Sequence, residues 1–579
     1  MMFRVLCKRL LPMMLAAGLL LTGCGGADDT DATVTTTGKE NGTTSTTAAS
    51  TAANGSEGST TATDGDGSIS TGGDSSVTST TSTTKTTATT KPTTVAFKNA
   101  LKNTVKGNFS TDPLQADGEL YGEANRNQFH YSTKFGWGND PNGLVYYDGE
   151  WHLFYQHNTE SNYFGRCWWG HAVSKDLLHW EELAPALAPT DKYNIWSGSC
   201  VVDKNDTTGF FDGGSGLVAM FTYAETNNNQ CQGIAYSKDK GRTWTMIEEP
   251  VLYTDGEQAF RDPKVFWHEE SGKWIAIIAG GQVRIYSSPN LQDWTLECKP
   301  SIWTECPDMF KMKVEGTNET KWVISLAGKG FVVGDFDGKT FTPLTGSVMD
   351  EDSPDRYAGQ TFFNAPNGRR IEMVWFGSWT YGTELATMLP GNAVYSLPVE
   401  LSLVKNGNDY KIVRTPVKEI DALRGEKVFS AKNGYVKAGS ANLFKDIAAK
   451  TLDIELTFVP KGDEVIGFKF RTGTDQEVVV SYDCSKNKLY VDRSKTVSKP
   501  KIKSFTRKYN TVIEPDANGE VTLRIMLDWN GVEIFANDGT VMSALLLPDK
   551  AADDVEFYVE NGTAQIVSLD AWRVKSIWK

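Results

Sequence analysis

The fold is indicated by a short stretch that recurs along the middle of the chain, first as Gly149-Glu-Trp-His-Leu-Phe-Tyr155. A polar turn is followed there by an apolar or alternating run, which is typical of a β-strand. The stretch returns as Gly216-Leu-Val-Ala-Met-Phe-Thr-Tyr223, Gly272-Lys-Trp-Ile-Ala-Ile-Ile278, Thr320-Lys-Trp-Val-Ile-Ser-Leu326 and Arg370-Ile-Glu-Met-Val-Trp-Phe376. The spacing, roughly 50 to 65 residues, is near that of four-stranded propeller blades.

A second recurring unit joins a β-rich stretch to a turn and then to an aromatic residue. It reads Ala172-Val-Ser-Lys-Asp-Leu-Leu-His-Trp180, Ala235-Tyr-Ser-Lys-Asp-Lys-Gly-Arg-Thr-Trp244 and Tyr286-Ser-Ser-Pro-Asn-Leu-Gln-Asp-Trp294, with a degenerate copy at Gly334-Asp-Phe-Asp-Gly-Lys-Thr-Phe341. An ordinary β-sandwich with chance similarity is the alternative interpretation. Because the two units recur in step, we favour a five-bladed β-propeller.

A polar segment stands before each repeated strand, at equivalent places. The segments are Asn139-Asp140-Pro-Asn-Gly143, Trp196-Ser-Gly-Ser199, Arg261-Asp262-Pro263, Glu305-Cys-Pro-Asp308 and Asp355-Arg-Tyr-Ala-Gly-Gln360. In a propeller, the starts of the innermost strands surround the central channel on one face. We therefore predict that Asp140, Asp262 and Glu305 meet in one acidic pocket.

The pattern changes near Glu426 to short alternating strands such as Asp453-Ile-Glu-Leu-Thr-Phe-Val459. Turns of the Asn-Gly and Asp-Gly type separate these strands, as hairpins require. The expected fold class is thus all-β: a five-bladed propeller at residues 97–424 followed by a β-sandwich at residues 425–579. For the sandwich we favour a structural role over sugar binding.

The N-terminus has the pattern of an exported, lipid-anchored protein. Residues 1–23 combine basic residues with a short apolar run, as a signal peptide does, and end in Leu21-Thr22-Gly23-Cys24, which resembles a lipoprotein cleavage box. We expect a lipid on Cys24 to hold the protein at the membrane on the cell surface; an ordinary signal peptide is the alternative. Residues 24–96 are rich in Thr and Ser and poor in apolar side chains, which predicts a disordered tether.

The composition excludes several kinds of partner. The formal net charge is −14 and no long basic cluster follows the signal region, so nucleic acid is not expected. The cysteines of the mature chain show no close C-x-x-C spacing, and none of the six histidines forms an HExxH pair, so we predict no metal and no cofactor. A neutral polymer fits this surface better.

The acidic residues suggest glycoside hydrolysis, because that reaction uses one carboxylate at the anomeric carbon and a second one, of raised pKa, that protonates the leaving oxygen. The segments Asn139-Asp140-Pro-Asn-Gly143, Phe260-Arg-Asp-Pro263 and Glu305-Cys-Pro-Asp308 together resemble glycoside hydrolase family 32, the invertases, levanases and inulinases. The segment Trp169-Gly-His-Ala-Val-Ser-Lys-Asp-Leu-Leu-His-Trp180 also reads like that family. The resemblance extends from about Asn127 to the C-terminus.

The resemblance implies a role for each matching residue. Asp140 would be the nucleophile, Glu305 the general acid and base, and Asp262 the carboxylate that stabilises the transition state. The residues implied in substrate binding are Asn139, Gln156, Phe164, Trp196, Ser197, Arg261, Asp355 and Trp379, and Phe164 stands where a Trp is common in the family. Such enzymes retain the anomeric configuration.

These expectations describe a secreted retaining hydrolase that removes terminal β-D-fructofuranosyl units from levan or inulin, and from sucrose. A surface lipoprotein that binds fructan without cleaving it is one alternative, although all three carboxylates are present. A fructosyltransferase is the other, because water and sugar acceptors compete in the same pocket. The expected partner in each case is a fructan or sucrose-type carbohydrate.

Overall fold

The computed structural model describes residues 104–107, 120–225, 227, 229–254, 259–349, 353–386, 388–389, 391–497 and 502–578. The predicted signal peptide, the lipid on Cys24 and the tether up to residue 96 lie outside these residues. The described chain is all-β, with only the short helices η1 (Pro366–Gly368), α1 (Gly382–Leu385) and η2 (Lys418–Leu423). No helix in the described part is long and apolar enough to cross a membrane.

In the described residues up to Pro416, the strands form five antiparallel sheets. Sheet 1 holds β2 (Trp137–Tyr147), β3 (Glu150–Asn158), β4 (Trp168–Ser174) and β5 (Trp180–Leu187). Sheet 2 holds β6 (Tyr193–Asp203), β7 (Gly216–Glu225), β8 (Gln230–Ser237) and β9 (Trp244–Ile247), with β1 (Thr104–Gly107) beside β9 and β10 (Leu252–Tyr253) beside β8.

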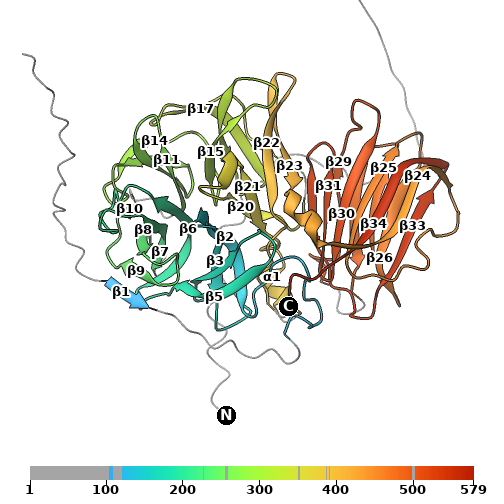
Figure 1. The fold of residues 1–579 in the computed structure, drawn as a ribbon, viewed down its shortest axis with the longest axis horizontal. Coiled ribbons are helices and arrows are strands. Elements are labelled where there is room, and N and C mark those ends of the chain that lie inside the picture. Colours follow the sequence, from blue (N-terminus) through green and yellow to red (C-terminus); the bar gives the residue numbers. More distant parts are fainter. Residues whose placement is uncertain are drawn as a thin grey trace, which may run out of the picture. The chain divides into compact units, whose positions relative to one another are not determined.

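The next three sheets follow in chain order (Figure 1). Sheet 3 holds β11 (Arg261–His268), β12 (Lys273–Ala279), β13 (Arg284–Ser288) and β14 (Thr295–Cys298). Sheet 4 holds β15 (Asp308–Lys313), β16 (Thr320–Ser325), β17 (Gly330–Phe336) and β18 (Phe341–Pro343), with β19 (Val348–Met349) beside β17. Sheet 5 holds β20 (Tyr357–Thr361), β21 (Ile371–Trp375), β22 (Val399–Asn406) and β23 (Asp409–Pro416).

The stretches that repeat in the sequence occupy equivalent places in these sheets. Each recurring apolar run forms a second strand, namely β3, β7, β12, β16 and β21. Each turn-aromatic unit links a third strand to a fourth. In three of them the indole N–H of the Trp donates to a backbone carbonyl of the turn: Trp180 to Leu177 (3.0 Å), Trp244 to Gly241 (2.9 Å) and Trp294 to Leu291 (3.1 Å). The sequence repeat is therefore a repeat of one four-stranded unit.

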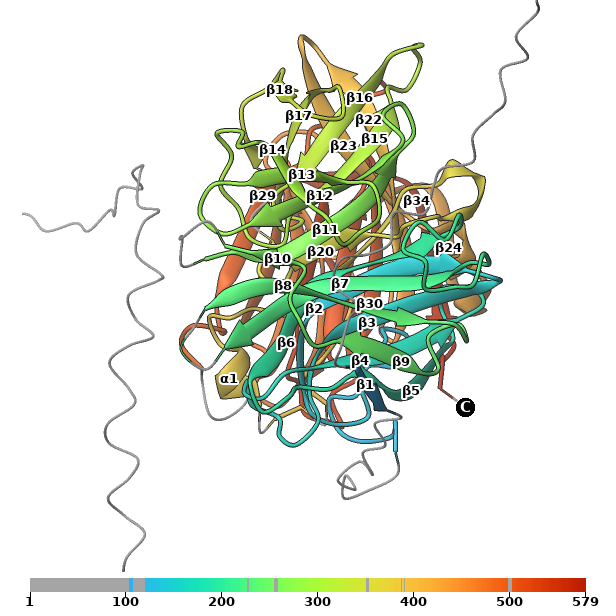
Figure 2. The same cartoon turned by 90° about the vertical axis from the view of Figure 1, so that its left-hand side faces the viewer.

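The first strands of the sheets lie against one another (Figure 2). β2 contacts β6, β6 contacts β11, β11 contacts β15, β15 contacts β20, and β20 contacts β2. Apolar clusters fill the space between neighbouring sheets; Phe154 and Phe221, for example, belong to the cluster between sheets 1 and 2. This burial stabilises the arrangement and brings together the polar segments that begin the first strands.

The C-terminal region forms two further sheets, and the sandwich expected there is observed. In the described residues sheet 6 runs in the order β24-β34-β25-β30-β31-β32, and sheet 7 runs β29-β28-β27-β26-β33. One apolar core, which includes Leu456 of sheet 6 and Phe468 of sheet 7, lies between them. The bounds in sheet 6 are β24 (Arg424–Lys437), β25 (Leu452–Val459), β30 (Val521–Asp528), β31 (Gly531–Ala536), β32 (Val541–Leu545) and β34 (Thr563–Val574), and those in sheet 7 are β26 (Val465–Gly473), β27 (Gln476–Asp483), β28 (Lys488–Lys495), β29 (Lys508–Val512) and β33 (Asp554–Glu560).

Candidate active site

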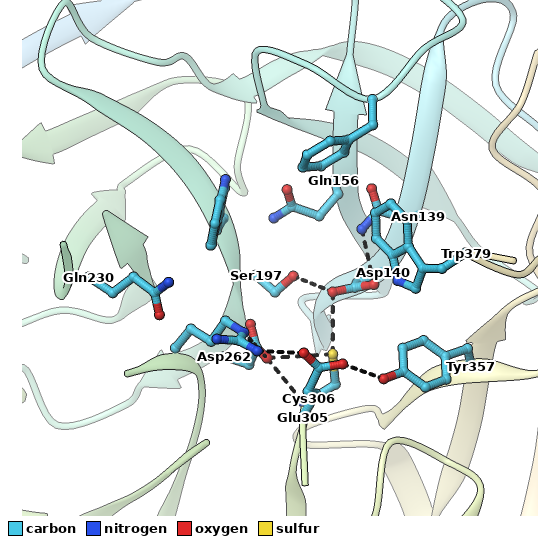
Figure 3. Close-up of a pocket in the computed structure, with 13 residues that line it drawn as sticks. Asn139, Asp140, Gln156, Ser197, Gln230, Asp262, Glu305, Cys306, Tyr357 and Trp379 are labelled. Carbon is cyan, nitrogen blue, oxygen red and sulfur yellow. Dashed lines mark hydrogen bonds and ion pairs between the residues drawn. The ribbon is translucent and has the colours of Figure 1, made fainter. Parts of the chain in front are cut away.

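A cavity of about 280 Å³ opens where the first strands of sheets 1 to 5 begin. Sheet 1 contributes β2 and β3, sheet 2 contributes β6 and β8, sheet 3 contributes β11, and sheet 5 contributes β20. Glu305 and Cys306 lie in the segment just before β15 of sheet 4. Figure 3 shows the side chains of the lining residues gathered around this space. The lining residues are Asn139, Asp140, Gln156, Phe164, Trp196, Ser197, Gln230, Arg261, Asp262, Glu305, Cys306, Tyr357 and Trp379.

Asp140 lies buried at the base of the cavity and accepts several hydrogen bonds. The Ser197 hydroxyl donates to Oδ2 over 2.6 Å, and Asn139 Nδ2 donates to Oδ1 over 3.0 Å. The Cys306 thiol donates to Oδ2 over 3.3 Å. Burial raises the pKa of this carboxyl above its usual range, and the three donors oppose that rise. The donors also fix the orientation of the carboxylate.

Asp262 lies beside Asp140 in an unusual backbone conformation. Its φ of 62° is in the left-handed region, and the β11–β12 register shifts between Arg261 and Lys264. Its amide donates to Thr222 Oγ1 over 3.0 Å, and its Oδ2 accepts the backbone N–H of Cys306 over 3.0 Å. Burial raises the pKa of Asp262 to about 7, although the positive charge of Arg261 lowers it.

Glu305 stands at the more open side of the cavity, with its side chain 47% exposed. Arg261 Nη2 donates to Oε1 over 2.5 Å, and the Tyr357 hydroxyl donates to Oε2 over 2.5 Å. Burial acts to raise the pKa of Glu305, but the two donors and the charge of Arg261 outweigh it, so the pKa is lowered. The sequence-based expectation of a raised pKa on this residue is therefore not met in the free site, because Arg261 and Tyr357 stabilise the charged form.

Cys306 lies between the two buried aspartates. Its Sγ and one carboxylate oxygen each of Asp140 and Asp262 all lie within 4.8 Å of one another. Burial, together with the two aspartates and Glu305, raises the pKa of the thiol well above its usual range. The thiol therefore stays protonated and acts as a hydrogen-bond donor to Asp140.

Aromatic side chains form one wall of the cavity. Trp379 is 46% exposed and Phe164 is 39% exposed, and their rings meet edge to face with centroids 5.3 Å apart. Trp137 packs behind both rings, and its indole N–H donates to Asn139 Oδ1 over 2.8 Å. Exposed aromatic faces beside buried carboxylates suit a sugar, which has apolar C–H faces and polar hydroxyls.

Ten of the eleven residues expected at the site line this cavity, and Asp355 does not. Asp355 is fully buried and pairs with Arg493 of sheet 7, which places it away from the cavity. It also accepts the hydroxyl of Tyr381 and the backbone N–H of Leu545 (2.8 Å). The residue of this segment that reaches the cavity is Tyr357, two positions later.

Three lining residues, Tyr357, Gln230 and Cys306, were not among the predicted site residues, although Cys306 lies within the segment that begins at Glu305. Tyr357 belongs to the polar segment before the fifth repeated strand, and such segments were expected to surround the central pocket. Gln230 begins a third strand, β8, where no motif marked it; its side-chain carbonyl accepts the Phe260 N–H over 2.8 Å, next to Arg261. It lines the cavity because sheets 2 and 3 are adjacent.

A cavity with carboxylates on several sheets and an aromatic wall is the site of a glycoside hydrolase. Residues 130–416 match the N-terminal domain of glycosyl hydrolases family 32, and residues 419–573 match the C-terminal domain of that family. The chain therefore belongs to glycosyl hydrolase family 32.

Relatives of the chain include levanases and an exo-inulinase. It is 38% identical to a levanase of Bacillus subtilis (strain 168) over 81% of this chain and 73% of the levanase. A levanase of Bacillus sp. (strain L7) is 34% identical, and the match spans 53% of that longer protein. An extracellular exo-inulinase of Aspergillus awamori is 32% identical over 79% of this chain and 96% of the inulinase.

Solved structures show the same fold. The exo-inulinase of Aspergillus awamori superposes with a TM-score of 0.74 at 30% identity, over 79% of this chain and 100% of that chain. A fructofuranosidase of Schwanniomyces occidentalis, solved with fructose, superposes with a TM-score of 0.68 at 28% identity, over 79% of this chain and 99% of that chain.

Proposed function

We propose that the protein is a β-fructofuranosidase that hydrolyses terminal fructose units from fructans of the levan or inulin type, and from sucrose. The observation that carries this proposal is the cluster of Asp140, Asp262 and Glu305 in one cavity with an aromatic wall, in a chain of glycosyl hydrolase family 32. The relatives named as levanases and exo-inulinase support fructan as the substrate class.

In this reaction Asp140 is the nucleophile. Its Oδ2 forms a bond to the anomeric carbon of fructose while the bond from that carbon to the leaving oxygen breaks. Ser197 and Asn139 hold the carboxylate in one orientation, which favours attack from a fixed direction. The product of this first step is a fructosyl ester on Asp140.

Glu305 is the general acid and base. In the first step it gives its proton to the leaving oxygen; in the second it takes a proton from water, which attacks the anomeric carbon and releases Asp140. The lowered pKa of Glu305 in the free site means that it must bind a proton as substrate enters. Displacement of the Arg261 contact by sugar hydroxyls would favour that protonation.

The remaining cavity residues bind the fructose unit. Asp262 and Arg261 accept and donate hydrogen bonds to its hydroxyls, and the negative charge of Asp262 stabilises the positive charge that develops on the ring. Asn139, Gln156 and Ser197 supply further polar contacts. The rings of Trp196, Trp379 and Phe164 enclose the sugar and its leaving group.

We also propose an architecture and a location for the protein. Sheets 1 to 5 are the blades of a five-bladed propeller, at residues 97–424, with the sandwich at residues 425–579. The ring of contacts among the five first strands supports this arrangement. Residues 1–23 are a signal peptide, Cys24 carries the lipid anchor, and residues 24–96 tether the enzyme outside the cell; the sequence pattern supports these assignments.

The test is fructose release from levan, inulin and sucrose by the parent protein, Asp140→Ala and Glu305→Ala. The proposal predicts release by the parent and a loss of nearly all turnover in both variants, and the preferred polymer identifies the natural linkage. Binding of fructan without release of fructose by the parent would replace the hydrolase with a binding lipoprotein. Transfer of fructose to a second sugar at high substrate concentration would indicate a fructosyltransferase.

A further inference from the structure

The region between sheets 5 and 7 contains a buried ion pair that no catalytic role explains. Arg493, near the end of β28, and Asp355, just before β20, are joined through Nη1 and Oδ2, and both side chains are fully buried. The guanidinium also donates to the carbonyls of Phe505 (2.8 Å) and Leu545 (3.1 Å) and to the hydroxyl of Tyr381 (2.7 Å). A buried charge with this many partners holds its contacts in one geometry.

Asp355 is anchored to the sandwich by its backbone as well as its side chain. Its amide donates to the Ser543 carbonyl over 3.2 Å, and Oδ2 accepts the Leu545 N–H over 2.8 Å, so two residues of β32 hold it. Arg356, the next residue, pairs instead with Glu372 in its own sheet. Ser353 also exchanges hydrogen bonds with Ser543, so the sandwich holds the segment before β20 at positions 353 and 355.

The start of β20 carries a residue that contacts the proposed acid. Tyr357 is two residues after Asp355, and its hydroxyl donates to Glu305 Oε2 over 2.5 Å. The ladder between β20 and β21 is irregular here, because the register shifts between Tyr357 and Gln360, and Ala358 has a φ of 54°. Tyr357 pairs with Trp375 of β21, but the ladder is interrupted directly after it, while the segment before it is held by the sandwich at Asp355.

We propose that Arg493 of the C-terminal sandwich is a positioning residue for glycoside cleavage, which acts through Asp355 on Tyr357 and so on Glu305. The inference rests on the proposed function of Glu305 as acid and base. It gives the sandwich a part in catalysis, although no described residue of the sandwich lines the cavity. An Arg493 that only joins the domains is the opposing account.

The test compares kcat and KM for sucrose in the parent protein, in Arg493→Met/Asp355→Asn, in Tyr357→Phe, and in the combination of all three changes. The paired substitution removes both charges together, because a single one would leave a buried charge without its partner. Lys411→Met is the matched control: Lys411 of β23 pairs with Asp538 of the sandwich over 2.8 Å and lies away from the cavity. All variants are first checked for thermal unfolding well above the assay temperature.

If Arg493 acts through Tyr357, the paired substitution lowers kcat at least about 10-fold with KM within about 2-fold, and the control stays near the parent. In the Tyr357→Phe background the paired substitution then lowers kcat less than about 2-fold, because residues acting in one chain are non-additive. An unchanged kcat, or an equal loss in both backgrounds, would overturn the proposal.

Should the paired variant fail to fold, Arg493→Lys replaces it. This variant keeps the charge but loses the planar fork of donors, and the same non-additive loss with Tyr357→Phe is expected. Failure of the proposed function can be told apart from failure of the Arg493 proposal, because in the former case the parent and Lys411→Met would release no fructose.

Discussion

Arg261 Nη2 lies 2.5 Å from Glu305 Oε1, so the side chain proposed as the acid is ion-paired in the free site. The same guanidinium extends toward Asp262, with Nε 3.7 Å from Oδ2. Burial acts to raise the pKa of both carboxyls and prevails at the buried Asp262, whereas at the more exposed Glu305 the hydrogen bonds from Tyr357 and Arg261 and the charge of Arg261 outweigh it. The Arg261 guanidinium thus acts to lower the pKa of both carboxyls, but only the pKa of Glu305 ends below its usual value.

The raised pKa of Asp262 is open to direct measurement. Since burial raises it to about 7, we expect infrared difference spectra to show a carboxyl that takes up a proton as the pH falls through about 7. Asp262→Asn should remove that band, whereas Asp516→Asn, at an exposed turn whose carboxylate accepts backbone N–H groups, should not. Arg261→Met should move the midpoint to higher pH, because the charge that lowers it is gone. A midpoint near 4 in the parent would contradict this account.

Ser197→Ala should impair the attack by Asp140. The lost hydrogen bond is made to a carboxylate, so kcat/KM for sucrose should fall roughly 10- to 100-fold. The loss should be larger at lower pH, because removing this donor raises the pKa of Asp140 further. Ser287→Ala is the matched control, since its hydroxyl donates over the same 2.6 Å to Glu297 in sheet 3. Equal kinetics in the two variants would show that the Ser197 contact is not used.

Much of the fold could be predicted because short sequence patterns indicate its strands and turns. The second strands and the turn-aromatic units repeat at similar spacing, and the polar segments before them mark the starts of β2, β6, β11, β15 and β20. Equivalent positions then converge in space, which is why Asp140, Asp262 and Glu305 were found together. The alternating C-terminal strands likewise indicated the sandwich.

What could not be predicted depends on partners far away in the chain. Asp355 sits in a polar segment like the others, but its environment is made by Arg493, 138 residues later. The lowered pKa of Glu305 depends on Arg261 and Tyr357, which come from two other sheets. No pattern within a single segment carries that information.

The contact between the sandwich and the segment just before β2, which contains His130, should weaken at alkaline pH. His130 is fully buried between Asp528 (2.8 Å) and Glu533 (3.1 Å), and although burial lowers its pKa, the two carboxylates raise it to about 9. Because the folded pKa exceeds the unfolded one, this contribution is full below about pH 6.5 and is lost as the pH rises through about 9. It amounts to at most roughly 3 kcal/mol.

Urea unfolding at pH 6.5 and 9.5 measures this effect. The free energy of unfolding of the parent should fall between the two values, and His130→Gln should lose most of that difference. His179→Gln should behave like the parent, because the His179–Asp176 pair is about half exposed. The same pH dependence in all three proteins would exclude His130 as its source.

Removal of metal ions should not change the activity. Asp140, Asp262 and Cys306 present ligand atoms close together. The two carboxylates are already engaged, however: Asp140 accepts hydrogen bonds from Ser197 and Asn139, and Asp262 accepts the backbone N–H of Cys306. After dialysis against a chelator we expect the rate on sucrose to stay within about 2-fold of its starting value. A loss restored by one added divalent ion would mean that this cluster holds a metal.

The central claim is that Asp140 forms a bond to fructose while Glu305 supplies and removes the proton. It is tested most directly by treating Glu305→Gln with β-fructosyl fluoride, whose leaving group needs no proton, and digesting the quenched protein for mass spectrometry. The account predicts a peptide that carries one fructosyl unit as an ester on Asp140, and no such peptide in Asp140→Asn/Glu305→Gln. Fluoride release without any labelled peptide, or a label on another residue, would contradict it.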